Sequence, residues 1–120
     1  MPTPLSKAKP KTLTEIQSAM DEFVRSRGWY GQGSEKPQLP RNLAASISLE
    51  ANELLECFQW NEEADRDQVG EELADVLLYA AQLANVLDID LGSAVDRKLE
   101  RNQDRFPTVE NVPWPRRLAV

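Results

Sequence analysis

Two acidic pairs with the same spacing constrain the fold of this chain more than any other feature. Glu50 precedes Glu53, and Glu72 precedes Asp75, by three residues. On a helix this spacing places both side chains of a pair on one side, about 60° apart around the axis. Each pair borders an apolar stripe with helical periodicity. Two such helices joined by a short polar loop pack antiparallel, so we expect the four acids to face one another.

Four converging carboxylates need a cation. Two negative charges about 5 Å apart repel by about 3 kcal/mol at an effective dielectric constant of ~20. Mg²⁺, or Mn²⁺ in its place, offsets this repulsion because hard divalent ions prefer carboxylate and water oxygens. A single acidic pair of this spacing is more often a solvated surface feature. Here two such pairs lie at the edges of the apolar stripes of two consecutive predicted helices, and this repetition favours a metal site.

The remainder of the chain predicts an all-α fold, because no stretch shows the alternation of a strand. The segments with helical periodicity are 13–27, 40–60, 66–87 and 91–105. Their starts carry helix-initiation signals, namely capping boxes at Thr12–Glu15 and Asp65–Gln68, Pro40, and Asp90. The third segment is apolar around most of its circumference, and a chain of 120 residues can hardly cover it alone. We therefore predict a four-helix bundle that oligomerisation completes.

Composition limits the function classes. The chain has no histidine, which excludes His-based triads and His-ligated zinc. A net charge of −6 argues against binding a nucleic acid polymer. The chain has no apolar run long enough for a membrane span, no signal segment, and a single cysteine, which together predict a cytoplasmic protein. We expect one helical domain over residues 12–107, between a flexible tail (1–11) and an irregular tail (108–120).

The acidic pairs and their surroundings resemble the E-x-x-E…E-x-x-D signature of the MazG-like nucleotide pyrophosphohydrolases. Glu50-Ala-Asn-Glu53 and Glu72-Leu-Ala-Asp75 carry the signature, and flanking stretches extend the resemblance to the small dCTP-pyrophosphatase-like branch. The resemblance implies Mg²⁺ ligation by the four acids and hydrolysis of a (deoxy)nucleoside triphosphate to the monophosphate and pyrophosphate. It also implies a homo-oligomer, commonly a dimer or tetramer. Glu53 or the nearby Glu56 could accept the proton of the attacking water.

The resemblance also suggests substrate-binding residues. Trp29 and Trp60 are candidates for stacking on the base, although core packing is the alternative. Lys98, Asn102 and Arg105 share one face of the fourth helix and would suit phosphate oxygens, although basic residues also favour a helix C-terminus. The other candidates are Arg41 and Asn42, from a Pro-Arg-Asn stretch, and Tyr79, which could instead pack near the site.

One departure from the family pattern bears on specificity. Pro37-Gln38-Leu39 stands where this branch usually carries a Phe-His pair, within a loop about five residues longer. Base and sugar recognition, including a preference for dCTP or a modified dNTP in nucleotide-pool sanitation, therefore does not follow from the resemblance. The alternatives are a non-catalytic oligomeric scaffold or nucleotide sensor, and a phosphoribosyl-ATP-type pyrophosphohydrolase.

Overall fold

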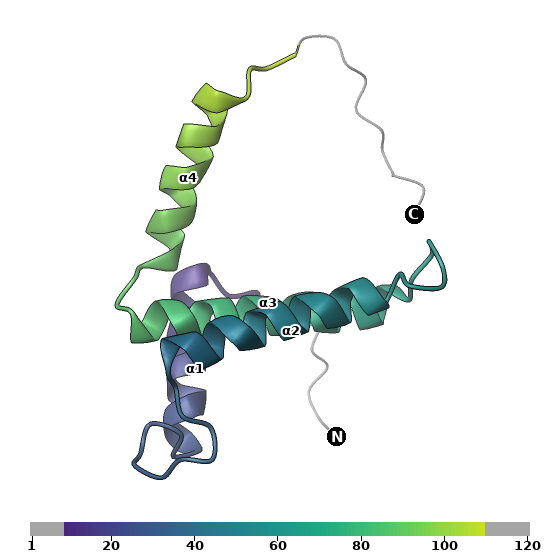
Figure 1. Ribbon diagram of the computed structural model, residues 1–120. Coiled ribbons are helices and arrows are strands. Elements are labelled where there is room, and N and C mark those ends of the chain that lie inside the picture. Colours follow the sequence, from purple (N-terminus) through teal and green to yellow (C-terminus); the bar gives the residue numbers. More distant parts are fainter. Residues whose placement is uncertain (1–8, 110–120) are drawn as a thin grey trace.

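The computed structural model describes residues 9–109, which form four helices and no strand (Figure 1). The helices are α1 (Leu13–Ser26), α2 (Pro40–Glu56), α3 (Arg66–Val86) and α4 (Leu91–Arg105). The all-α prediction is thus confirmed. The predicted tails, 1–11 and 108–120, fall almost entirely outside the described residues, and the domain bounds drawn from them stay predictions.

α1 begins and ends as its sequence predicts. The Thr12 hydroxyl accepts from the backbone N–H of Glu15 at 3.2 Å, and the Glu15 carboxylate accepts from the Thr12 N–H at 2.9 Å, which completes a capping box. Gly28 follows the helix with φ of +73°, a conformation that side chains with a Cβ rarely adopt. The chain thereby turns from α1 into the loop that precedes α2.

Two helix boundaries differ from the prediction. α2 ends at Glu56 rather than near Trp60, because the N–H groups of Cys57 and Phe58 bond three residues back, to Leu54 and Leu55. These bonds form a tight turn instead of a further α-helical turn. The predicted capping box at the start of α3 is wrong, since the Asp65 carboxylate accepts from the N–H of Asp67.

α2 and α3 lie side by side as an antiparallel pair (Figure 1). α1 crosses this pair and packs against α3, whereas α4 leads away from the pair and contacts mainly α1 (Figure 1). One chain therefore does not close a four-helix bundle. Large apolar side chains stay uncovered as a result, including Leu73 of α3 at 52% exposure and Leu99 of α4 at 56%.

The core of the described part is small. Its fully or nearly buried apolar residues are Val24, Leu43, Ala81 and Ala84, which lie where α1, α2 and α3 meet. None of the four described helices combines the length and the apolar character that a membrane crossing requires.

Candidate functional site

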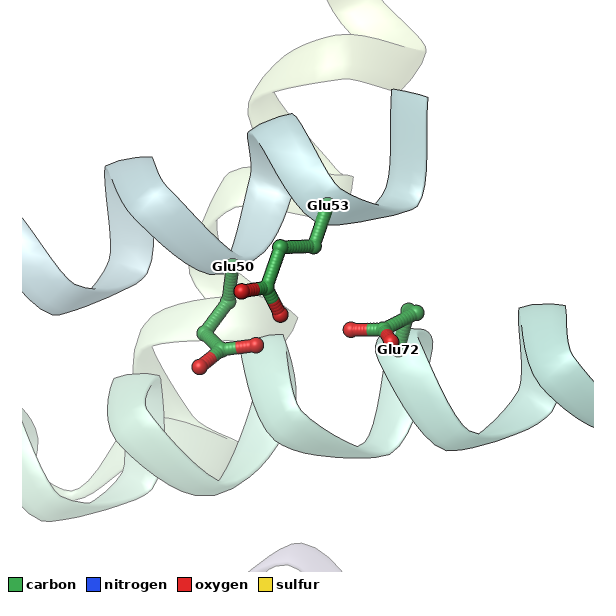
Figure 2. Close-up of side chains that lie close together, drawn as sticks. All are labelled: Glu50, Glu53 and Glu72. Atoms are coloured by element: carbon green, nitrogen blue, oxygen red, sulfur yellow. The ribbon is translucent and has the colours of Figure 1, made fainter. Parts of the chain in front are cut away.

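Three of the predicted metal ligands converge between α2 and α3. Glu50 and Glu53 extend from α2 toward α3, and Glu72 extends from α3 toward them (Figure 2). One carboxylate oxygen of each lies within 4.8 Å of the others. The i,i+3 spacing on α2 and the antiparallel packing of the two helices place these side chains together. We call these three residues the acid cluster.

Crowding of negative charge perturbs the acid cluster. Partial burial is the largest cause that raises the pKa of Glu50, from its ordinary value of 4.5 to about 7. The neighbouring Glu53 carboxylate adds to this shift, because it can form a hydrogen bond only with protonated Glu50 and because its charge repels the ionised form. The pKa of Glu72 is also raised, first by burial and then by the charge of Glu53. Without a counter-charge, Glu50 therefore tends to keep its proton up to about pH 7.

The donor set of the acid cluster fits a hard divalent cation. Glu50 Oε2 and Glu72 Oε2 are both buried and have no hydrogen-bond partner. Such buried oxygens are costly, and a cation among them would supply the missing interaction. Carboxylate oxygens with no sulfur or imidazole among them are the ligands that Mg²⁺ and Mn²⁺ prefer.

The two other acids predicted to act in the site, Asp75 and Glu56, lie outside the acid cluster. Asp75, one helical turn after Glu72, is outside the group of close oxygens, but its charge raises the pKa of both Glu50 and Glu72. Asp75 also lines a cavity next to the cluster. Glu56 is exposed near the end of α2, where Asn52 Nδ2 lies 3.4 Å from its carboxylate. The structure therefore connects Asp75, but not Glu56, to the acid cluster.

The cavity has a volume of about 700 Å³ and lies between α1, the loop that follows it, α2 and α3. Small-molecule sites commonly have volumes of about 300–1,000 Å³, so this cavity has the size of a small-molecule site. Four predicted site residues line this cavity: Trp29, Asn42, Asp75 and Tyr79. Asp75 lines the cavity and its charge acts on Glu50 and Glu72, so the acid cluster and the cavity adjoin.

The aromatic ring of Trp29 lies at the cavity wall, where two neighbouring side chains contact it. The ring of Phe23 meets it edge-on with centroids 5.6 Å apart. The Lys36 ammonium lies 4.7 Å from the centre of the Trp29 ring, which is cation–π geometry. Trp29 is therefore held in place while it borders the cavity.

Five predicted substrate-binding residues do not line this cavity: Arg41, Trp60, Lys98, Asn102 and Arg105. Trp60 lies in the turn after α2 and is 89% exposed. Lys98 and Arg105 are exposed on α4, and Asn102 is half-buried there. Since α4 leads away from the α2–α3 pair, one chain does not bring these residues to the acid cluster (Figure 1).

Several lining residues were not predicted as site residues, among them Ser46, Lys36 and Gln38. A signal for Ser46 exists in the sequence, because Asn42, Ser46 and Glu50 follow one another at intervals of four on α2. No comparable signal exists for Lys36 and Gln38. Their loop has no period, so its composition does not reveal which side chains turn inward.

Similarity to known proteins agrees with this geometry. Residues 45–112 match the MazG-like family. The chain belongs to the MazG-like family. The dCTP pyrophosphatase 1 of Rattus norvegicus is 35% identical over an alignment 114 residues long, and this alignment covers 87% of this chain and 64% of the relative. The human dCTP pyrophosphatase 1 is 35% identical over 106 residues, covering 80% and 59%.

This MazG-like chain thus spans less than two thirds of the length of the curated relatives it matches. A crystal structure of a pyrophosphatase from Archaeoglobus fulgidus is similar over 84% of this chain and 97% of that one. The two share 38% identity and superpose with a TM-score of 0.65. The predicted resemblance to the dCTP-pyrophosphatase-like branch is therefore confirmed.

Proposed function

We propose that this MazG-like chain is a divalent-metal-dependent nucleoside triphosphate pyrophosphohydrolase. The observation that carries the proposal is the acid cluster, whose two buried oxygens without partners adjoin a cavity of small-molecule size. The relatives named dCTP pyrophosphatase make dCTP the first substrate to test, beside modified deoxynucleotides. The products would be a nucleoside monophosphate and pyrophosphate, and the role a control or clean-up of the cytoplasmic nucleotide pool.

Glu50, Glu53, Glu72 and Asp75 would hold Mg²⁺, with Mn²⁺ as a substitute. When bound, the metal neutralises phosphate charge and makes a water more acidic. Water attacks one of the two phosphorus atoms that the α–β bridging oxygen joins. The bond between that phosphorus and the bridging oxygen breaks, and the products are the monophosphate and pyrophosphate. Glu53 is the proposed acceptor of the water's proton, because it is the exposed member of the acid cluster. Glu56 is less suited, since it lies outside the cluster.

The cavity would hold the nucleoside. Trp29 and Tyr79 offer aromatic rings on which a base can stack, and Asn42 offers an amide that can both donate and accept hydrogen bonds. Lys36 lies against the Trp29 ring, so a base that stacks on that face has to displace the ammonium. A carboxylate repels phosphate oxygens, so Asp75, at the border of the cavity and the acid cluster, would act on the triphosphate only by helping to hold the metal.

We further propose a homo-oligomer, a dimer or a tetramer, that completes the helical bundle. The support is the uncovered apolar surface of α3 and α4, represented by Leu73 and Leu99. The predicted phosphate-binding face of α4 (Lys98, Asn102 and Arg105) would then meet the acid cluster of another subunit. The same arrangement would bring Trp60 and Arg41 close to a neighbouring chain. A free nucleotide, not a nucleic acid polymer or a membrane, is the proposed partner, consistent with the net charge of −6.

The proposal is tested by measuring pyrophosphate release from a panel of ribo- and deoxynucleoside triphosphates and phosphoribosyl-ATP, with Mg²⁺ or EDTA. We expect release from at least one deoxynucleotide, and none with EDTA. Activity on phosphoribosyl-ATP alone would support the related enzyme class instead. Binding of Mg²⁺ and nucleotide without turnover, measured by titration calorimetry, would indicate a sensor, and binding of neither would indicate a scaffold.

A further inference from the structure

Gln82 is the one polar residue that is completely buried within the described part of the chain, residues 9–109. It lies on α3 seven residues after Asp75, about two helical turns further along, beyond Leu78 and Tyr79 of the cavity wall. A buried amide costs free energy unless its groups are hydrogen-bonded. Its partners therefore show which segments it joins.

Three hydrogen bonds fix the orientation of the Gln82 amide. Asn85 Nδ2 donates to Gln82 Oε1 at 3.1 Å. The oxygen of the Gln82 amide therefore faces Asn85, and its nitrogen, Nε2, faces the loop after α1. Gln82 Nε2 donates to the Tyr30 hydroxyl at 2.9 Å and to Gln38 Oε1 at 3.1 Å. A single side chain of α3 thus binds both ends of that loop.

The two loop residues that bind Gln82, Tyr30 and Gln38, each make a further hydrogen bond that fixes the side chain. The Tyr30 hydroxyl donates to Asp21 Oδ1 at 2.6 Å, and burial together with Asp21 raises the pKa of Tyr30, so the hydroxyl keeps its proton. Gln38 Nε2 donates to the backbone carbonyl of Lys36 at 2.7 Å. Tyr30 directly follows Trp29, and both Lys36 and Gln38 line the cavity. The network therefore ends on the residues that form one wall of the pocket.

We infer that Gln82 is a positioning residue of the nucleotide pocket, which holds the loop of residues 29–39 so that its side chains face the cavity. This inference rests on the proposed function. Gln82 is not among the cavity-lining residues, so it acts through Tyr30 and Gln38. The acid cluster lies on α2 and α3 and does not depend on the loop. Loss of Gln82 should therefore weaken nucleotide binding and leave the chemical step intact.

Replacement of Gln82 by methionine keeps the length of the side chain and removes all three hydrogen bonds. If the loop then adopts its hydrogen-bonded conformation about a tenth of the time, KM rises about tenfold, because apparent affinity scales with the fraction of molecules that can bind. We expect kcat to stay within about twofold, since the acids that would bind the metal are unchanged. Hydrogen exchange of the nucleotide-free protein should become faster in residues 30–38.

Tyr30→Phe tests the route of the effect and serves as a milder variant if Gln82→Met does not fold. It removes one hydroxyl outside the cavity lining, so KM should rise less than in Gln82→Met. Because both changes break the hydrogen bond between Gln82 and Tyr30, their combined effect on KM should be smaller than the product of the two separate effects. The stability control is Thr12→Ala, which removes the N-cap of α1 far from the loop. It should lower the melting temperature without changing KM.

Unchanged KM and unchanged loop exchange in both Gln82→Met and Tyr30→Phe would overturn the inference. So would an equal rise of KM in Thr12→Ala, because general loosening would then explain the effect. Inactivity of the unaltered protein on every nucleotide would overturn the proposed function instead. Hydrogen exchange would in that case still decide whether Gln82 holds the loop.

Discussion

Replacing Glu50 by glutamine should stabilise the metal-free protein at pH 8 but hardly at pH 5. Burial and the neighbouring acids raise the pKa of Glu50 from 4.5 to about 7. In the unfolded chain the group ionises near 4.5, so between pH 4.5 and 7 the native state holds the proton and the unfolded state does not. The stability contribution of Glu50 is therefore fully present at low pH and is lost as pH rises through this window. Glutamine remains neutral throughout and avoids the loss.

The repulsive part of the effect follows from the distance between the carboxylates. Charges 4.8 Å apart, the upper limit of the spacing within the acid cluster, repel by about 1 kcal/mol in a water-like dielectric and about 3 kcal/mol at a dielectric constant of ~20. Because the cluster is partly solvated, we use the lower figure for the pair of Glu50 and Glu53. About 1 kcal/mol corresponds to a rise in melting temperature of about 4 °C for a domain of this size.

The assay is a thermal melt at pH 5 and pH 8, with EDTA or Mg²⁺, at a fixed protein concentration. Mg²⁺ should raise the melting temperature of the unaltered protein at pH 8 by mass action and that of Glu50→Gln much less. Glu22→Gln, a change at an exposed acid of α1, is the control and should alter neither quantity. A lower melting temperature of metal-free Glu50→Gln at pH 8, or equal shifts at both pH values, would refute the repulsion argument.

Three further predictions follow from the same structure. Asp75→Asn should lower turnover by at least about a hundredfold with an unchanged circular dichroism spectrum, because a proposed metal ligand is lost; near-native turnover would exclude that role. Gly28→Ala should cost about 1 kcal/mol in urea denaturation, because φ is +73° there, and an unchanged midpoint would contradict this. Leu99→Glu should reduce the mass measured by light scattering; an unaltered protein of 13.6 kDa, a monomer, would refute the proposed oligomer.

The sequence predicts those parts of the fold that local interactions determine. The number of helices and the caps at Thr12 and Asp90 depend on residues within one turn, and the structure contains them. The end of α2 was predicted too late, because the apolar residues after Glu56 continue the helical pattern although the backbone tightens into a turn. The direction of α4 could not be predicted, since the sequence does not show which surface covers the apolar residues of that helix.

The candidate site also has one part that the sequence predicts and one part that it does not. Convergence of Glu50, Glu53 and Glu72 follows from helical spacing and one antiparallel pair, and both are visible in the sequence. The cavity wall could not be predicted, because Lys36 and Gln38 lie in a loop without periodicity. Their placement depends on hydrogen bonds across 44 and 52 residues, from Gln82 to the loop, which no local pattern contains.

The central claim, metal-dependent cleavage between the α- and β-phosphates, is tested most directly by ³¹P NMR of the products. The protein is incubated with dCTP and the other deoxynucleoside triphosphates, with Mg²⁺ and with EDTA. The account predicts that pyrophosphate and a monophosphate appear in equal amounts from at least one nucleotide with Mg²⁺, and that neither appears with EDTA. Inorganic phosphate with a diphosphate, or cleavage that persists in EDTA, would contradict it.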